Sequence, residues 1–162
     1  MLYNKKIASA LLTNSGGFTI LKAQRHLIPG QYATIGGSMV HILICDDDAV
    51  FGQDMAKKIL ALPAYSPKLM NVQCLTNVSA MSAGELTKFD ILFLDIDLGD
   101  KNGIELARTM RVHNAEAVLI LVTNFSEYAP EGYEVDAFRY LPKAELDRKL
   151  PGYFSDALVV CR

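Results

Sequence analysis

The stretch FDILFLDIDLGDKNGIELA, residues 89–107, decides the fold class of this chain and raises the question of its chemistry. Its apolar run Ile91–Leu94 predicts a buried strand that ends at two aspartates, Asp95 and Asp97. A loop rich in Gly, Asp and Asn follows, and a helix-like pattern comes after the loop. Aspartates at the carboxyl end of a buried strand seldom serve packing, so we treat them as candidate functional residues.

Strand-like and helix-like segments alternate from Met39 onward. We predict strands at 40–45, 69–75, 91–94, 117–122 and 137–140. Helices are predicted at 49–62, 79–84, 103–113 and 126–132, followed by a last helix that Pro151 and Gly152 break or restart. The strand segments are mostly continuous apolar runs, which indicates strands covered on both faces. The predicted fold class is therefore α/β, with an open, doubly wound parallel sheet of five strands.

Residues 1–38 differ from the rest of the chain, with glycine pairs and weak periodicity. Met39 directly precedes a strand, as a native initiator does. We expect an added or misassigned leader at 1–38, with a structural extension particular to this protein as the alternative. The domain itself is expected to span 39–162.

The overall composition excludes several classes of protein. The chain has 162 residues and a net charge of −2 without a Lys/Arg run, so we expect no direct DNA binding by this chain. Its cysteines, Cys45, Cys74 and Cys161, are odd in number and lack metal-site spacing, which favours buried free thiols in a reducing compartment. No apolar run approaches the ~20 residues of a membrane span, and no secretory signal is visible. We expect a cytoplasmic protein with no membrane association.

Polar side chains follow four of the predicted strands. Because the carboxyl ends of parallel strands meet at one edge of the sheet, these residues are expected to lie close together. They are Asp46, Asp47 and Asp48 after the first strand, Asp95 after the third, Thr123 and Asn124 at the end of the fourth, and Lys143 after the fifth.

This set of side chains suits phosphoryl transfer. Asp48 is expected to cap a helix, but further carboxylates at one strand end repel each other unless a cation lies among them, and magnesium suits such oxygens. Asp95 can then act as an ionised nucleophile, with Thr123 and Lys143 on the phosphoryl oxygens. Each residue also has an ordinary structural alternative. The acids Asp46–Asp48 can simply form a helix N-terminus, and Asp95 can be a loop residue. Thr123 can be an ordinary strand residue, and Lys143 a solvated surface lysine.

Four motifs, HILICDDD, FDILFLDIDLGDKNGIELA, LILVTN and FRYLPK, resemble in this order the receiver domain of bacterial two-component response regulators, over about residues 39–160. The resemblance implies a flavodoxin-like, CheY-like sheet of strand order 2-1-3-4-5. The segment NFSEYAPEGYEVDAFRYLPK is similar to the LytTR-type branch, whose receivers usually precede a DNA-binding domain. No such domain follows before Arg162, so we expect control of transcription through an output domain absent from this chain.

The resemblance assigns roles to the acidic residues. Asp95 matches the phosphoacceptor. Asp46 and Asp47 match the acidic pair that binds Mg²⁺, with Asp47 as a direct ligand and Asp46 acting through water. Asp97 matches the position whose backbone carbonyl ligates the metal.

The resemblance also assigns Thr123 and Lys143 to phosphate contact, Tyr140 to the switch aromatic and Gly103 to the glycine of the loop after the acceptor. The sequence departs from the family in three places. The loop LGDKNG lacks the usual proline, Asn124 replaces a small residue, and the proline that commonly follows the lysine here precedes it, as Pro142.

The implied function is phosphorelay signal transduction. A sensor histidine kinase is expected to phosphorylate Asp95, with homodimerisation on phosphorylation; the chain acts as a switch with slow autodephosphorylation, not as a turnover enzyme. One alternative is a pseudo-receiver that binds proteins without phosphorylation. Another is a haloacid-dehalogenase-type phosphatase, suggested by the D-x-D of Asp95 and Asp97, although the other acidic residues lie upstream of it and Gly99 departs from that motif.

Overall fold

The structure, a computed structural model, describes residues 39–161 apart from 78–80, 100 and 126–127. The predicted extension at 1–38 lies outside the described residues, as do the expected helix starts at Ser79 and Ser126. None of the described helices is long and apolar enough to cross a membrane.

The described chain forms one five-stranded parallel sheet. Its strands are β1 (Val40–Cys45), β2 (Met70–Leu75), β3 (Ile91–Leu94), β4 (Val118–Thr123) and β5 (Arg139–Pro142), in the order β2-β1-β3-β4-β5. The parallel sheet and its strand order are as expected. All residues of β3 and β4 are buried, whereas the edge strands β2 and β5 are only partly covered.

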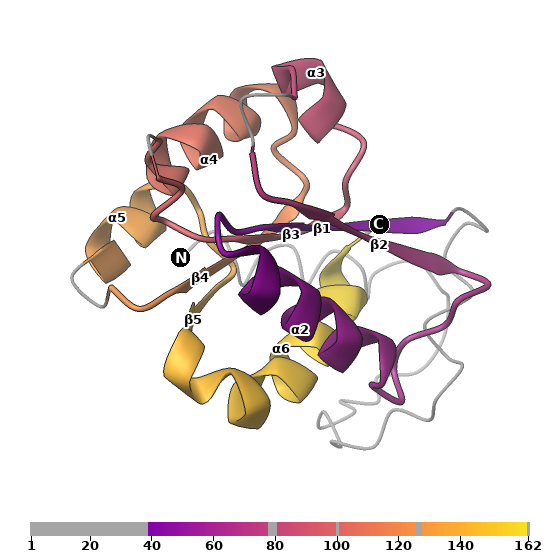
Figure 1. The fold of residues 1–162 in the computed structure, drawn as a ribbon. Helices are drawn as coiled ribbons and strands as arrows, with labels where there is room; N and C mark the ends of the chain where they lie inside the picture. Colours follow the sequence, from indigo (N-terminus) through magenta and orange to yellow (C-terminus); the bar gives the residue numbers. More distant parts are fainter. Residues whose placement is uncertain (1–38, 78–80, 100, 126–127, 162) are drawn as a thin grey trace, which may run out of the picture.

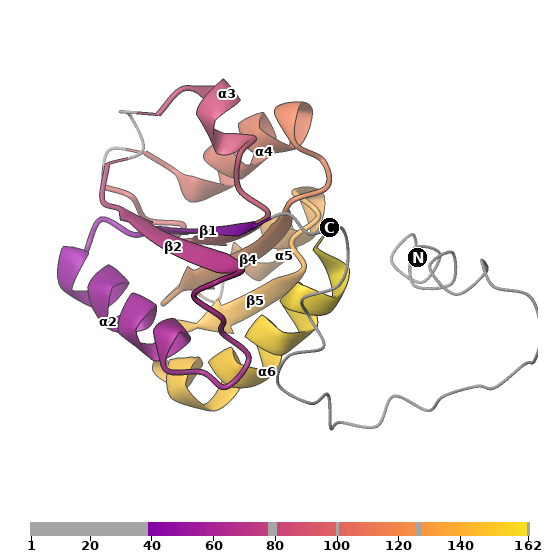
Figure 2. The ribbon, with the colours of Figure 1, turned by 90° about the vertical axis from the view of Figure 1, so that its right-hand side faces the viewer.

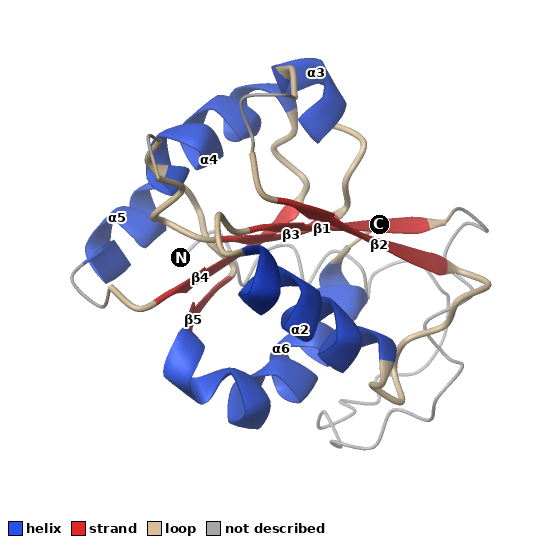
Figure 3. Cartoon of the chain, viewed as in Figure 1, coloured by secondary structure: helices blue, strands red, loops and turns tan. Residues whose placement is uncertain are grey.

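Helices cover both faces of the sheet, which gives three layers (Figures 1 and 3). One face carries α2 (Ala49–Leu60) and α6 (Leu146–Val160), and the other carries α3 (Ala83–Leu86), α4 (Gly103–His113) and α5 (Ala129–Glu134). Figure 2 shows the same layers after a quarter turn. Alternate side chains of the central strands enter two separate apolar clusters, one under each helical layer.

The starts of α2 and α4 are fixed by short polar side chains. The Asp48 carboxylate accepts hydrogen bonds from the backbone N–H groups of Val50 and Phe51, at 2.9 and 3.1 Å, and so caps α2 as expected. The Asn102 side chain accepts from Ile104 N at 2.7 Å and caps α4. Because α2 and α4 follow β1 and β3 closely, these caps also fix the loops at the functional edge of the sheet.

Several boundaries differ from the sequence prediction: α2 ends two residues earlier, β4 lies one residue later and α5 ends two residues later than predicted. The last strand lies at Arg139–Pro142, two residues later than predicted. The expected break at Pro151 and Gly152 was wrong, because α6 continues through both residues. Leu150, Phe154 and Ala157 are almost completely buried on one side of α6, and this burial outweighs the roughly 3 kcal/mol that an internal proline costs.

Gly103 allows the start of α4 to approach the end of β3. Its N–H donates to the carbonyl of Ile96 at 2.7 Å. A Cβ at this position would overlap the carbonyl oxygen of Asp95 and would lie 2.9 Å from the Cα of Ile96. Backbone atoms cannot move aside as a side chain can, so only glycine fits here.

We therefore predict that Gly103→Ala lowers the free energy of unfolding by about 3 kcal/mol, the upper part of the usual range for overpacking. Gly152→Ala is the matched control, because nothing lies within 4 Å of a Cβ there and alanine is the better helix former. That control should raise the free energy of unfolding by about 0.5–1 kcal/mol in urea titrations. Equal stability of Gly103→Ala and the wild type would contradict the packing argument.

The three cysteines are free thiols, but only two are buried: Cys74 is exposed, against expectation. Burial raises the pKa of Cys45 to about 12 and that of Cys161 to about 11. A raised pKa keeps both thiols protonated near neutral pH, and the protonated form is a poor nucleophile.

We predict that a disulfide reagent at pH 8 modifies Cys74 alone in the folded protein. Burial raises the pKa of Cys74 too, so this reaction should be slower than that of a free peptide thiol. All three thiols should react after unfolding in guanidinium. Fast labelling of the folded Cys74→Ser variant would show that Cys45 or Cys161 is accessible after all.

Candidate functional site

Asp46 and Asp95 lie side by side at the carboxyl edge of the sheet. In the register of β1 and β3, Cys45 pairs with Leu94, so the next residue of each strand stands at the same level. The Asp95 N–H donates to the Cys45 carbonyl at 2.9 Å. Only 2% of Asp46 and 4% of Asp95 is exposed, so both carboxylates are largely desolvated.

The buried polar side chains of the described residues gather at this edge. They are Asp46, Asp95 and Thr123, the last of which is fully buried. Burying a carboxylate is costly unless it is paired, so two adjacent ones require cations close by. The rest of the buried sheet is apolar, which makes this edge the candidate functional site.

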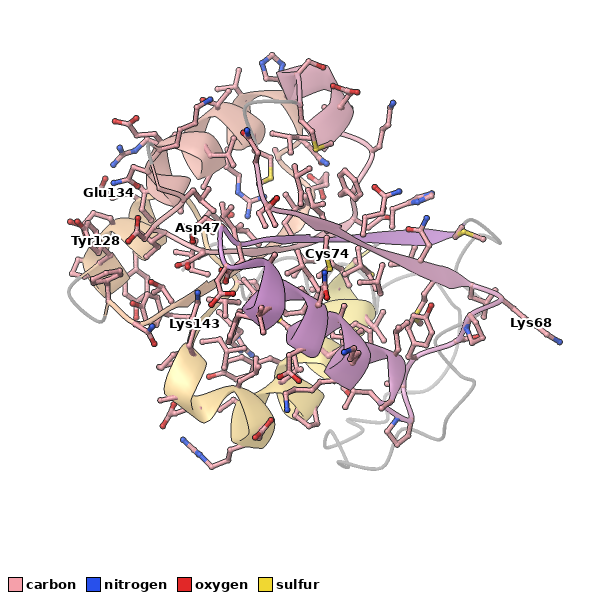
Figure 4. All side chains as sticks on the ribbon, viewed as in Figure 1. Asp47, Lys68, Cys74, Tyr128, Glu134 and Lys143 are labelled. Atoms are coloured by element: carbon pink, nitrogen blue, oxygen red, sulfur yellow. The ribbon has the colours of Figure 1, made fainter. Side chains whose placement is uncertain are left out.

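Lys143 supplies one such cation. It begins the short 3-10 helix Lys143–Glu145 directly after β5, and its Nζ lies 2.7 Å from Asp46 Oδ2 and 2.6 Å from Asp95 Oδ2. Figure 4 shows it at the same end of the sheet as Asp47. The proline before the lysine therefore does not keep its side chain from the site.

The electrostatics of this ion pair are finely balanced. Burial alone would lower the pKa of Lys143, but hydrogen bonds and charge attraction from Asp46 and Asp95 outweigh burial and raise it, so the lysine stays an ammonium. Burial raises the pKa of Asp46, and the opposing bonds from Lys143 and the Asp48 N–H do not fully compensate. Asp46 is therefore the member of the pair whose ionised form is disfavoured, and further positive charge would favour that form.

Asp46, Asp47 and Asp95 form the candidate metal site. Each can offer one oxygen such that all three oxygens lie within 4.8 Å of one another. Three carboxylates against the single Lys143 ammonium leave two negative charges when all are ionised, which one divalent cation balances. The donors are all hard carboxylate oxygens, and the exposed Asp47 leaves one side open to water, as magnesium prefers.

Asp97 lies beside this cluster, but its side chain serves the loop. Its Oδ1 accepts from Gly99 N at 3.3 Å, and its own N–H donates to Asp95 Oδ1 at 3.3 Å. The hydrogen bonds that close the turn, Leu98 N to Lys101 O and Gly103 N to Ile96 O, do not use the Asp97 carbonyl. Metal ligation by that carbonyl stays a prediction, and it is compatible with this geometry.

Thr123 and Tyr140 are connected through Phe125. The Phe125 N–H donates to Thr123 Oγ1 at 3.3 Å, and the Tyr140 hydroxyl donates to the Phe125 carbonyl. Tyr140 is half-buried against the apolar cluster under α3, α4 and α5. Its hydroxyl is therefore held by the backbone of the same loop that holds the threonine.

Two residues of this site were missed by sequence reasoning. Phe125 joins Thr123 to Tyr140 through backbone atoms, which carry no signal in the residue type. The Phe51 ring lies with its centroid 4.4 Å from Lys143 Nζ, whereas from the sequence Phe51 was only part of the predicted helix 49–62. Its position three residues after the cap Asp48 was the available hint, since that places it in the first turn beside the strand end.

Comparison with known proteins agrees with this geometry. Residues 42–153 match the family described as the response regulator receiver domain. The sensory transduction protein LytT of Bacillus anthracis is 30% identical over 105 residues, which are 65% of this chain and 42% of LytT, so the chain spans less than half of that relative.

Solved structures share the fold. A CheY-like receiver domain protein from Methanospirillum hungatei is 25% identical with a TM-score of 0.57, and the match covers 75% of this chain and 95% of that one. The response regulator TrrA from Thermotoga maritima, solved in complex with Mg(2+)-BeF, is 20% identical with a TM-score of 0.57, over 74% of this chain and 99% of that one.

The family match covers well over half of the chain, and it spans the strands whose ends carry Asp46, Asp95, Thr123 and Lys143. The sheet has the strand order that the resemblance implied, and it brings these four side chains to one edge. This chain belongs to the response regulator receiver domain family.

Proposed function

We propose that this receiver is a phosphorylation switch in which Asp95 accepts a phosphoryl group from a sensor histidine kinase. The observation that carries the proposal is the convergence of two buried carboxylates, a buried hydroxyl and an ammonium at the ends of four strands. Phosphoryl transfer needs mainly positioning and charge neutralisation, which this arrangement supplies.

In the proposed reaction, an Asp95 carboxylate oxygen attacks the phosphorus of the donor. The phosphorus–nitrogen bond to the kinase histidine breaks, and its electron pair stays with the imidazole nitrogen. Magnesium, when bound by Asp46, Asp47 and Asp95, would neutralise charge on the transferring group. Lys143 turns its ammonium, which already contacts Asp95 Oδ2, towards a phosphoryl oxygen.

Thr123 connects the phosphoryl group to the surface. Its hydroxyl can donate to a phosphoryl oxygen. When the hydroxyl reorients to do so, the hydrogen bond that it accepts from Phe125 N weakens. A hydrogen bond to a charged group contributes about 1.5–3 kcal/mol, against about 0.5–1.5 kcal/mol for a neutral one. The difference, about 1 kcal/mol, shifts a two-state equilibrium roughly five- to tenfold, and Lys143 adds to it.

We propose that this shift of the conformational equilibrium changes the position of Tyr140. Movement of Phe125 towards or away from Thr123 displaces the carbonyl that holds the Tyr140 hydroxyl. The face formed by α5, β5 and α6 would then change, and it is where we place a second subunit or an output domain. LytT is named a sensory transduction protein, and similar chains are named transcriptional regulatory proteins, which supports an output in transcription.

The remaining properties follow as part of the same proposal. The chain undergoes one phosphorylation and slow loss of the phosphoryl group, so it is a switch and not a turnover enzyme. With a net charge of −2 it binds DNA only through a further domain.

The dehalogenase-type alternative needs the Asp97 side chain as an acid or base, yet that side chain holds the turn at Gly99. A pseudo-receiver would have no need of the two buried carboxylates that Lys143 pairs with.

We predict that acetyl phosphate with magnesium adds one phosphoryl group to the protein, and that Asp95→Asn abolishes the addition. Mass spectrometry of the intact protein and of its peptides measures the product. Asp54→Asn, an exposed aspartate of α2, is the matched control and should label like the wild type. Asp47→Ala and excess EDTA should each prevent labelling.

Undiminished labelling in EDTA would contradict the metal requirement. Labelling of Asp95→Asn at wild-type yield would contradict the choice of acceptor. Steady turnover of a generic phosphoester would instead favour the phosphatase alternative, and a folded protein that takes no label under any condition would favour the pseudo-receiver.

We further predict that beryllofluoride with magnesium shifts the NMR resonances of the Tyr140 ring in the wild type. In Thr123→Ala the site should still bind beryllofluoride, because Asp95 and Lys143 remain, but the Tyr140 shift should be lost or strongly reduced. An equal Tyr140 shift in both proteins would show that the threonine does not carry the coupling.

A further inference from the structure

We infer that Phe51 is a positioning residue of this site, whose ring holds the Lys143 ammonium at the place where it meets the phosphoryl group; the inference rests on the proposed phosphorylation of Asp95. The ring centroid lies 4.4 Å from Lys143 Nζ, within the ~6 Å range of cation–π contacts. The ammonium is thus bounded by Asp46 and Asp95 from two strands and by Phe51 from the first turn of α2.

Lys143 needs such a partner because its side chain is long and flexible. It starts after the edge strand β5 and must reach the carboxylates at the ends of β1 and β3. A lysine loses rotamer entropy when it is fixed. A ring face beneath the ammonium restricts its position without adding a charge.

The contact with Phe51 differs from the two ion pairs in what competes for it. A divalent cation held by Asp46 and Asp95 would compete with Lys143 for their carboxylate oxygens, and an incoming phosphoryl group would draw the ammonium towards its own oxygens. An uncharged ring binds neither the metal nor the phosphoryl group. Of the three contacts, it alone can persist through the transfer and keep the ammonium in the site.

The ring is itself well anchored. The Phe51 N–H donates to Asp48 Oδ1 at 3.1 Å, and the Asp48 N–H donates to Asp46 Oδ1 at 3.0 Å. The ring packs against the apolar cluster under α2 and α6. The acidic run after β1 therefore provides carboxylates for the site and, through the helix cap, also places the ring that holds the lysine.

The test compares Phe51→Leu, which stays apolar but has no ring, with Phe51→Tyr, which keeps the ring face. The first measurement uses the protein without metal or phosphodonor. The ring current of Phe51 should shift the proton resonances of the Lys143 ε-methylene upfield in the wild type and in Phe51→Tyr. In Phe51→Leu these resonances should move to the position of an unconstrained lysine.

The second measurement is the rate of phosphorylation of Asp95 by acetyl phosphate with magnesium. We expect Phe51→Leu to be about three- to tenfold slower, the range of an exposed to partly desolvated cation–π contact, and Phe51→Tyr to restore the rate. In a Lys143→Met background, replacement of Phe51 by leucine should change the rate no further, because the ring then has no ammonium to hold.

Phe138→Leu is the matched control. The Arg139 guanidinium lies 4.2 Å from the centroid of the Phe138 ring, and Phe138 packs against the same apolar cluster as Phe51. It therefore loses a ring and a cation–π contact away from Lys143 and should leave the Lys143 resonances unchanged. Phe51→Met is a second variant of similar volume in case the leucine variant unfolds.

The inference is overturned if the Lys143 resonances are the same in Phe51→Leu and the wild type, or if the leucine replacement slows phosphorylation equally in the Lys143→Met background. The resonance comparison alone decides whether the ring positions the ammonium. If it does, and yet no protein accepts a phosphoryl group on Asp95, the proposed function fails while the positioning contact stands.

Discussion

The burial of two carboxylates at adjacent strand ends is the constraint on which the rest of this site depends. Asp46 and Asp95 are held by the register of β1 and β3, and neither can retreat to solvent without breaking the sheet. Lys143 compensates both, and removal of one partner from a buried ion pair generally costs about 3–5 kcal/mol. With Asp47 included, the cluster still carries more negative than positive charge, and burial already disfavours the ionised form of Asp46. The apolar sheet thus provides rigidity, while the unbalanced edge provides affinity for cations.

The same few residues fix both the loops and the chemistry. Asp48 caps α2, its backbone N–H donates to Asp46 and its side chain accepts from the N–H of Phe51, so one residue connects a candidate ligand to the ring beside Lys143. Gly103 lets α4 start against the backbone of Asp95 and Ile96, which places Asp95 between two closely packed segments. These links leave little freedom for Asp95 to move independently, as a site that works by positioning requires.

The sequence predicts this molecule well where a residue's role is local or set by its strand. The bounds of β1, β3 and α4 agree with the apolar pattern, because continuous burial and clear caps fix them. The position of β5 and the continuity of α6 depend on packing across the sheet, which overrides the local preference of Pro151. Asp46, Asp95, Thr123 and Lys143 could be expected at one edge because parallel strands share an edge. The roles of Phe51 and Phe125 could not be predicted. The role of Phe51 depends on the position that the Lys143 ammonium takes in the folded protein, and the role of Phe125 depends on its backbone atoms.

The geometry would let the proposed signal leave the site without a large rearrangement. Thr123 is fully buried at the end of β4 and cannot move far, so only its hydroxyl can reorient. That hydroxyl and the Tyr140 hydroxyl contact opposite ends of the same residue, the N–H and the carbonyl of Phe125. A change of the dihedral angles at Phe125 therefore alters both contacts together, whereas the strands on either side stay paired. In the proposed switch, a phosphoryl group on Asp95 would need only to offer Thr123 a stronger acceptor than the contact with Phe125, and the half-buried tyrosine at the edge of the sheet would then lose the carbonyl that fixes it.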